Sequence, residues 1–598
     1  MADYQAPLAD MMFTLEHVSD LAGLAALPGY EHAEPDVVHD LLAEAGRFAS
    51  EVLSPLNPVG DQQGAKLDNG VVSMPEGFKE AYAQFTEAGW GGVGQSETYG
   101  GAGLPYTVSA VITEMLASAN LSFGLCPALG DGAMEALEHH ASPELRDLFL
   151  PALVAGRFTA TMDLTEPQAG SDLGAIRTTA TPAGDGTHRI RGQKVFITFG
   201  DHDLAENIVH LVLARTPDAP AGSRGISCFI VPKFLVNADS SLGERNDLGV
   251  VSIEHKMGIH ASPTCVMTYG ENDACVGYLI GEENQGLRYM FTMMNRERIF
   301  VGLQGLGIAE RAYQAASAYA RERRQGRAVG REASSGDASA IIDHIDVRRM
   351  LMEMRASIEA MRCLLYLSAS ENDRSMRHPD EAERARASAA VALITPVTKA
   401  WLTDLGNHVT SLGIQVHGGV GFIEETGVSQ YFRDARITPI YEGTNGIQAM
   451  DLVLRKIGMQ NGAVLRAHLE RLRGMAAEVE GAGDELADTA RHLGDAIGAL
   501  ERASQWLLEK LASDQRSAAA GATPYLEMMG LVTGGALLAR CAAEATKLRG
   551  AGENARFLES KISTARFFAS QILPRAASLV PSVTAGADPL DALHAEDF

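Results

Sequence analysis

The amino-acid sequence predicts a mainly α-helical protein with a β-rich domain inserted between helical segments. Apolar residues recur with helical spacing over about residues 36–158 and again after Gly286. The stretch between them, about residues 159–285, consists of short β-rich runs separated by turn residues. At 598 residues the chain is also long enough for about four units of ordinary domain size.

Residues 1–158 are predicted to form an N-terminal helical domain. The spacing of Val38, Leu41 and Leu42 begins its helical pattern, and a glycine-rich turn segment at 89–103 interrupts it. The next 127 residues, 159–285, are predicted to form a middle β-domain. Its expected strands are the runs RIRGQKVFITFG, NIVHLVLARTP, GISCFIVPKFLV and CVMTYG.

Residues 286–460 are predicted to form a second helical domain. Long helical patterns cover LRYMFTMMNRERIFVGLQGLGIAERAYQAASAYARERR and MLMEMRASIEAMRCLLYL, and the polar segment GRAVGREASSGD between them is expected to be a loop. Gly302, Gly305 and Gly307 lie inside the first pattern with no strand before them. They therefore indicate close helix packing rather than a dinucleotide-binding fingerprint.

Residues 461–598 are predicted to form an additional helical domain. The boundary lies in the turn-rich segment IGMQNGA, and one apolar helix face follows it. That face comprises Leu493, Ile497, Leu500, Leu507 and Leu511.

Composition narrows the function classes. The net charge of −26 repels polyanions, so no nucleic-acid partner is expected. The six cysteines lack metal-ligand spacing, which predicts small buried side chains, no disulfide and no bound metal. The N-terminal segment is acidic, unlike a targeting sequence, and no run approaches the roughly 18 apolar residues of a membrane span. We expect a cytoplasmic protein without a membrane span.

The most informative segment is RDARITPIYEGTNGIQAMDLVLRK, in which Glu442 stands at the entrance of a predicted helix. The helix face carries Ile447, Met450 and Leu454. One interpretation is structural, with Glu442 complementing the helix dipole and Thr444 capping the helix. The other is chemical, with Glu442 acting as a general base in a site that excludes water.

Five segments in order favour the chemical interpretation, because together they resemble the acyl-CoA dehydrogenase family over roughly residues 36–460. They are DLTEPQAGSDLGA, KVFITFG, NRERIFVGLQGLGIAERAYQAASAYARERRQGR, QVHGGVGFIEETGVSQYFRDARI and IYEGTNGIQ. The resemblance implies an N-terminal helical domain, a middle β-barrel or sandwich, a C-terminal four-helix bundle and an FAD cofactor. It also identifies Glu442 as the catalytic base. Asp163 departs from the pattern, because a small residue is usual there.

The resemblance assigns FAD contacts to two parts of the chain. Leu164 and Thr165 would bond the flavin ring edge, and Phe196 and Thr198, two apart on one strand, would face the ring from the same side. Beside the catalytic base, Thr444 and Asn445 would also contact FAD.

A second group of residues would hold the other half of FAD. Arg323 and Gln325 would meet the pyrophosphate of a neighbouring subunit, although Gly326 and Arg327 depart from the usual pattern that follows. Further along the chain, the backbone around Gln415, Gly418 and Gly419 would approach the adenosine half closely. At least a homodimer is therefore expected.

The resemblance also assigns substrate contacts. Ser171 would reach CoA or flavin phosphates, and Asn295 with Arg298 would meet the CoA adenine. The backbone at Gly443 would touch the thioester. A CoA-binding arginine common in the family is Ala449 here, so that contact is not carried over.

The resemblance implies that Glu442 removes the α-proton of an acyl-CoA thioester while FAD accepts the β-hydride, giving a trans-2-enoyl-CoA. Electrons would pass to electron-transferring flavoprotein, in fatty acid metabolism. The length and the additional domain most resemble the large bacterial subgroup that includes 3-(methylthio)propanoyl-CoA dehydrogenase. Two alternatives remain open: an acyl-CoA oxidase that reduces oxygen, and a flavin-bearing relative that binds nucleic acid.

Overall fold

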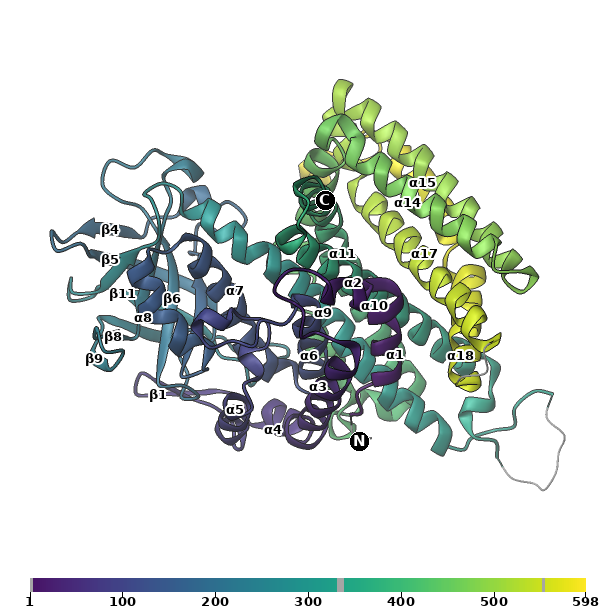
Figure 1. The fold of residues 1–598 in the computed structure, drawn as a ribbon, viewed down its shortest axis with the longest axis horizontal. Helices are drawn as coiled ribbons and strands as arrows, with labels where there is room; N and C mark the ends of the chain where they lie inside the picture. The colour runs from purple at the N-terminus through teal and green to yellow at the C-terminus, as the bar shows by residue number, and fades with distance from the viewer. Residues whose placement is uncertain (1–3, 331–337, 551–553) are drawn as a thin grey trace. The chain divides into compact units, whose positions relative to one another are not determined.

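The computed structural model describes residues 4–330, 338–550 and 554–598, without the side chains of residues 294 and 295. The chain forms two compact units. The first comprises Met1–Ala43, Pro105–Glu114 and Val301–Phe598, and the second comprises Glu44–Leu104 and Met115–Phe300. The predicted fold class is confirmed: the chain is mainly helical, and a β-domain interrupts the helices (Figure 1).

The β-domain lies in the second unit. Its main sheet has eight strands in the order β10-β11-β5-β12-β7-β6-β3, with β4 paired to β5. The strands are β3 (Phe158–Asp163), β4 (Thr179–Pro182), β5 (His188–Thr198), β6 (Asn207–Ala214), β7 (Ser227–Pro232), β10 (Leu248–Ile253), β11 (Thr264–Tyr269) and β12 (Val276–Leu279). Each of the four runs predicted to be strands overlaps one of them almost completely. The hairpins β1–β2 (Lys66–Asp68, Val71–Ser73) and β8–β9 (Phe234–Val236, Leu242–Arg245) lie outside this sheet.

The main sheet curls back on itself. The Thr161 hydroxyl on β3 donates to the Thr198 carbonyl on β5 at 2.7 Å, although three strands separate β3 from β5 in the sheet order. The Val195 amide of β5 donates to the Thr165 carbonyl at 2.9 Å. The end of β3 and the end of β5 therefore lie side by side, as expected for a closed or sandwich-like sheet.

The helices complete both units. The second unit contains α4 (Ser54–Gln63), α5 (Phe78–Glu87), α7 (Leu121–His140) and α8 (Pro143–Val154). The first contains α1 (Leu8–Thr14), α2 (Leu21–Ala25), α10 (Ile345–Arg377), α11 (Glu381–His417), α12 (Val428–Ala435) and α13 (Asn445–Asp451). Three helices continue from one unit into the other: α3 (Pro35–Phe48), α6 (Tyr106–Ala119) and α9 (Gly286–Glu322).

Glycines bring α9 and α11 close together, as the sequence predicts for Gly302 and Gly305. A Cβ on Gly302 would lie 2.8 Å from the Thr398 carbonyl oxygen, and a Cβ on Gly305 would lie 2.6 Å from that of Leu402. Both distances are shorter than a side chain tolerates, so only glycine permits this backbone approach.

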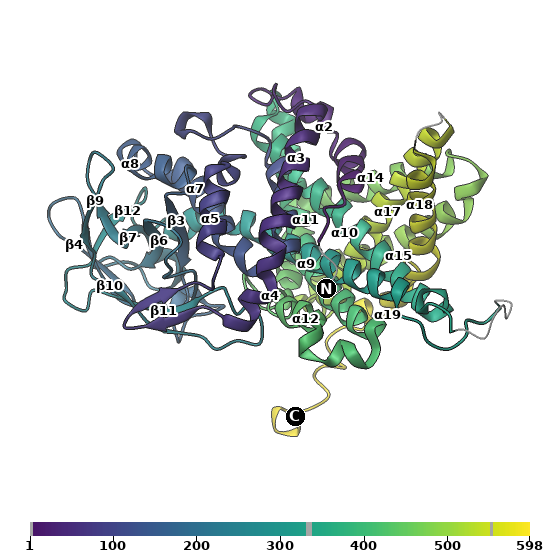
Figure 2. The same ribbon diagram turned by 90° about the horizontal axis from the view of Figure 1, so that it is seen from below.

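The additional domain is helical, as predicted. It comprises α14 (Ala463–Glu480), α15 (Ala487–Ser513), α16 (Gln515–Ala520), α17 (Ala522–Gly550), α18 (Ala555–Phe567) and α19 (Arg575–Thr584). Helices α14, α15 and α17 run side by side (Figures 1 and 2). Leu493, Ile497, Leu500 and Leu507 of the predicted apolar face are buried.

Helix α17 is long and apolar enough to cross a membrane, which corrects the expectation that no run in the chain approaches a membrane span. In the structure 89% of its most apolar window is buried against protein. Such burial is typical of a core helix, which must be apolar on all sides.

A buried ion cluster fixes the additional domain to the rest of the first unit. The Lys561 ammonium of α18 donates to Asp10 of α1 at 2.6 Å and to Glu359 of α10 at 2.7 Å. Beside it, the Arg362 guanidinium donates to Asp10 at 2.5 Å and to Glu114 at 2.6 Å. Burial opposes the charge of Lys561, but the two carboxylates outweigh it and hold its pKa above the usual range.

All six cysteines are buried with free thiols, as their pattern predicts. The loop predicted at GRAVGREASSGD is described only as far as Gly330, and its remainder lies outside the described residues.

Candidate active site

Glu442 lies in the turn between α12 and α13, with its side chain half-buried. Its backbone has a φ of 54°, and Gly443 after it has a φ of 84°. Left-handed backbone is costly for a residue with a Cβ, and it persists at functional sites where the surroundings fix it. The backbone at Glu442 is therefore held in one specific conformation.

Gln448 is the residue that fixes this turn. Its side-chain amide, buried in α13, donates to the carbonyls of Glu442 and Gly443, each at 3.3 Å. A Cβ on Gly443 would lie 2.8 Å from the same amide nitrogen, so the position requires glycine on two grounds. The Thr444 hydroxyl accepts from the Ile447 amide at 3.3 Å, which confirms the predicted helix cap.

Asn445 ties the turn to α11. Its amide donates to Asp404 at 2.8 Å, and its oxygen accepts from the Lys399 ammonium at 2.8 Å. Lys399 is fully buried, and burial raises the pKa of Asp404. Neither of these α11 residues was predicted. A lysine inside the apolar run ITPVTKAWL is unusual and could have indicated a buried polar contact. The FAD contact predicted for Asn445 stays a prediction.

The β-domain brings four other predicted residues together. Leu164 and Thr165 follow β3, and Phe196 and Thr198 lie at the adjacent end of β5. Besides the backbone bonds that join the two segments, the Lys194 ammonium donates to the Leu164 carbonyl at 3.0 Å. These four residues therefore lie on two backbone segments that run side by side.

Phe196 corrects the expected strand geometry. The pairing of β11 with β5 shifts register between Cys265 and Met267, whose partners are Ile197 and Lys194, so β5 bulges by one residue. Phe196 within the bulge has a φ of 61°. Simple alternation therefore does not set its direction relative to Thr198, because a bulge re-aims the side chain.

The consequence of the bulge is an exposed aromatic ring. Phe196 is 63% exposed, whereas Ile197 beside it is buried. An exposed aromatic ring on the segment that pairs with Thr165 suits contact with a flat aromatic ligand such as the flavin of FAD. Ser171 is exposed on the turn that follows Glu166, and this placement leaves its hydroxyl accessible.

A buried ion pair that was not predicted joins the segment after β3 to β5. The Lys194 ammonium donates to Glu166 at 2.9 Å, and the carboxylate also accepts from the amides of Arg177 and Thr178 at 2.7 and 3.0 Å. Burial opposes the Glu166 charge, but Lys194 and these hydrogen bonds outweigh it and lower its pKa to about 2. The two-residue segment Leu164–Thr165 is thereby anchored at its C-terminal side.

The remaining predicted FAD contacts gather at one end of the helices in the first unit. The Tyr319 ring of α9 stacks on His417 of α11 with centroids 4.5 Å apart, so the C-terminal ends of α9 and α11 are neighbours. Around these ends the five predicted residues are exposed: Arg323, Gln325, Gln415, Gly418 and Gly419. Gly418 has a φ of 64°, and a Cβ on either glycine would meet nothing within 4 Å. This open backbone suits close approach by a ligand.

Asn295 and Arg298 both lie on α9. Arg298 is half-buried, and the side chain of Asn295 is outside the described residues.

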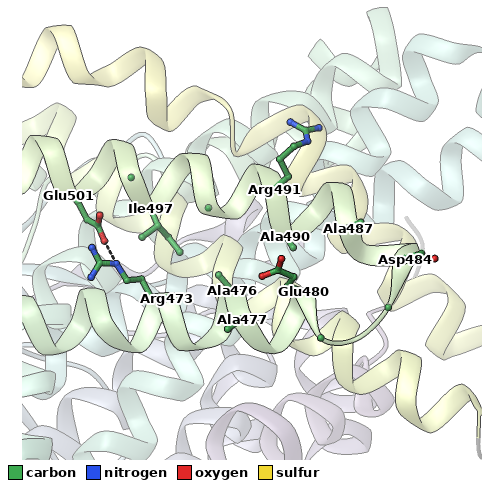
Figure 3. Close-up of a pocket in the computed structure, with 14 residues that line it drawn as sticks. Arg473, Ala476, Ala477, Glu480, Asp484, Ala487, Ala490, Arg491, Ile497 and Glu501 are labelled. Carbon is green, nitrogen blue, oxygen red and sulfur yellow. Dashed lines mark ion pairs between the residues drawn. The ribbon is translucent and has the colours of Figure 1, made fainter.

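A separate groove of about 770 Å³ lies between α14 and α15, where Arg473 pairs with Glu501 at 2.6 Å (Figure 3). Its lining residues include none of the predicted site residues.

Four family models match the chain in consecutive order. They are the acyl-CoA dehydrogenase N-terminal domain (residues 38–157), middle domain (161–271) and C-terminal domain (284–457), and the acetyl-CoA dehydrogenase C-terminal-like domain (469–594). The additional helical domain thus matches a family model different from the three that cover the rest of the chain.

Two curated relatives span nearly the whole chain. The 3-methylmercaptopropionyl-CoA dehydrogenase of Ruegeria pomeroyi is 48% identical over 95% of this chain and 96% of its own. A butyryl-CoA dehydrogenase of Syntrophomonas wolfei is 36% identical over 96% and 95%. Among solved structures, a Bacillus anthracis acyl-CoA dehydrogenase complexed with FAD has a TM-score of 0.73 at 21% identity, covering 96% and 91%. This last likeness shows the fold.

Proposed function

Because the chain belongs to the acyl-CoA dehydrogenase family and is an acyl-CoA dehydrogenase, we propose that it uses FAD to oxidise 3-(methylthio)propanoyl-CoA to the trans-2-enoyl-CoA. The observation that carries the proposal is the left-handed backbone turn on which Glu442 stands. Such strain in a base-bearing turn is expected where orientation toward a substrate proton matters.

In this proposal Glu442 takes the proton from the α-carbon of the thioester. The backbone amide of Glu442 binds the thioester oxygen, which stabilises the negative charge that develops as the proton leaves. Gln448, Gly443 and Thr444 keep the base in position, and Asn445 ties the turn to α11. FAD, once bound, supplies the acceptor for the β-hydride.

The residues that would hold FAD fit it chemically. Leu164 and Thr165 supply polar groups for the ring edge, and Phe196 with Thr198 supplies an aromatic and polar surface. The exposed backbone at Gly418 and the cation of Arg323 suit the other half of the cofactor, including its pyrophosphate. The FAD complex of the structural neighbour supports the same cofactor.

We also propose at least a homodimer, in which Arg323, Gln325 and the Gln415 segment complete the FAD site of the second subunit. Large apolar residues are exposed on this part of the first unit: Val420, Phe422, Ile423, Ile447, Met450 and Leu454. Phe422 is 85% exposed. Exposed apolar clusters of this kind mark interaction surfaces. A Phe422→Asp variant should lose both dimer and FAD in sedimentation with absorbance detection, and FAD-bound monomers would contradict the proposal.

The substrate assignment rests on the Ruegeria pomeroyi relative. The Syntrophomonas wolfei relative acts on butyryl-CoA, which offers a straight-chain thioester of nearly the same length as a comparison. A panel of acyl-CoAs from four to sixteen carbons, assayed with an artificial electron acceptor, tests the assignment. The proposal expects the highest kcat/KM with 3-(methylthio)propanoyl-CoA, and an optimum at long chains would contradict it.

Electron-transferring flavoprotein is the proposed acceptor. The enzyme should be reduced anaerobically with substrate and then mixed with either air or that flavoprotein. Rapid reoxidation by the flavoprotein, with little hydrogen peroxide formed in air, is expected. Stoichiometric peroxide at a comparable rate would identify an acyl-CoA oxidase instead.

A further inference from the structure

Asp163 is the residue in the flavin-binding segment where the sequence departs from the family pattern. It ends β3 and immediately precedes Leu164 and Thr165. Its side chain is fully buried. A carboxylate in such a place is unfavourable unless donors compensate it, because burial removes its hydration. The usual small residue at this position would incur no such cost.

Two residues distant in the sequence compensate this carboxylate. The Tyr269 hydroxyl of β11 donates to Asp163, and Nδ1 of His210 on β6 lies 3.2 Å from each carboxylate oxygen. Both partners are fully or almost fully buried, and their rings meet edge to face with centroids 6.0 Å apart. Burial and the nearby carboxylate hold the pKa of Tyr269 well above its usual range, so the phenol remains a donor.

The network lies at one side of the segment that would bind FAD. Leu164 and Thr165 have buried carboxylates on both sides in sequence, Asp163 before them and Glu166 after them. Glu166 pairs with the Lys194 ammonium, whereas the contacts of Asp163 are the two ring donors. The segment is therefore held from both sides. Among the described residues no lysine or arginine lies within ion-pair distance of Asp163, although the buried Lys194 ammonium that pairs with Glu166 also acts on it electrostatically.

We infer that Asp163, held by His210 and Tyr269, is a positioning residue that keeps a negative charge beside the flavin-binding segment and thereby lowers the reduction potential of bound FAD. The inference rests on the proposed function, since it takes Leu164 and Thr165 as FAD contacts. Reduction adds negative charge to the flavin ring, and a neighbouring like charge in a poorly solvated site disfavours it. A lower potential favours transfer of the electrons onward to the acceptor.

The test is a measurement of the FAD reduction potential by dye equilibration in the purified full-length enzyme. The Asp163→Asn variant keeps the shape of the side chain and removes its charge. Its reduction equilibrium should shift at least tenfold toward reduced FAD, which is about 30 mV for a two-electron couple. The Tyr269→Phe variant removes a hydrogen-bond donor to the Asp163 carboxylate and leaves its negative charge less compensated. The reduction potential of FAD in this variant should therefore fall.

Asn207→Ala is the matched control. Asn207 is a buried polar residue of β6, the strand of His210, and it bonds the Phe234 backbone instead of the Asp163 network. This variant should lose thermal stability without a change in potential. A merely structural role for Asp163 would give the same result as the control.

Unchanged potentials in FAD-bound Asp163→Asn would overturn the inference. If that variant does not retain FAD, Asp163→Ala replaces it with the same expected rise. If neither variant retains FAD, the reduction potential of FAD in the Tyr269→Phe variant decides. A potential equal to or higher than that of the wild type overturns the inference. A wild-type enzyme that binds no FAD, or does not oxidise acyl-CoA, would instead contradict the proposed function itself.

Discussion

Gln448 holds the backbone of Glu442, because its side-chain amide donates to the Glu442 carbonyl at 3.3 Å while its own helix begins three residues after Glu442. The same amide bonds the Gly443 carbonyl. A buried side chain thus fixes the one left-handed glutamate among the described residues, and the orientation of the base depends on a residue that need not touch the substrate.

Replacing Gln448 by Ala should lower kcat by about 10- to 100-fold, because small misplacements of a reacting group have effects of this size. FAD content and KM should change little. Steady-state kinetics with flavin absorbance test this prediction. Gln505→Ala, at an exposed glutamine of α15, is the control, and equal loss of kcat in both variants would contradict the assigned role.

Replacing Gly443 by Ala should abolish most activity and lower the free energy of unfolding by about 1–3 kcal/mol, since the position has a φ of 84° and a Cβ there would displace the Gln448 amide. The matched control is Gly474→Ala in α14, where a Cβ meets nothing within 4 Å. Helix propensity predicts that the control gains about 0.5–1 kcal/mol. Denaturant titration measures both, and a neutral Gly443→Ala would contradict the strained turn.

His202 should make the protein lose stability in mild acid. Burial lowers its pKa to about 3, so the unfolded chain binds a proton below pH 6.5 that the folded chain does not. The contribution of His202 to the free energy of unfolding is therefore complete above pH 6.5. It falls by up to about 1.4 kcal/mol per pH unit toward pH 3. Urea titrations of His202→Gln from pH 7 to 4.5 should show a shallower decline than wild type. Parallel curves would contradict the prediction, and exposed His39→Gln is the control.

Lys561→Met should destabilise the protein by about 1–3 kcal/mol, because Asp10 and Glu359 lose their shared buried cation and keep only Arg362 and Arg355 as partners among the described residues. Lys547→Met removes an exposed lysine paired with Glu544 and should cost at most about 1 kcal/mol. Thermal unfolding of both variants tests this difference. Similar melting temperatures would show that the buried cluster does not fix the additional domain.

The sequence predicted the parts of the fold and site that depend on local pattern. Helical periodicity located the long helices, and β-rich runs located the strands. The order of motifs identified the family, and the spacing around Glu442 predicted both its place before a helix and the Thr444 cap. These features follow from neighbouring residues, so one sequence is sufficient for them.

The features that escaped prediction depend on residues distant in the chain. The partners of Asp163 lie 47 and 106 residues away, and the lysine that fixes Asn445 lies 46 residues before it. Nothing local shows that Phe196 lies in a bulge or that Glu442 is left-handed, because both are residues that ordinarily avoid positive φ. Tertiary structure imposes these conformations.

The central claim is that Glu442 is the base that removes the α-proton. The most direct measurement is anaerobic mixing of the Glu442→Gln variant with acyl-CoA while flavin absorbance near 450 nm is followed. The claim predicts a yellow, FAD-bound variant whose absorbance does not bleach on a timescale at which wild type bleaches completely. Bleaching of the FAD-bound variant at the wild-type rate would contradict it.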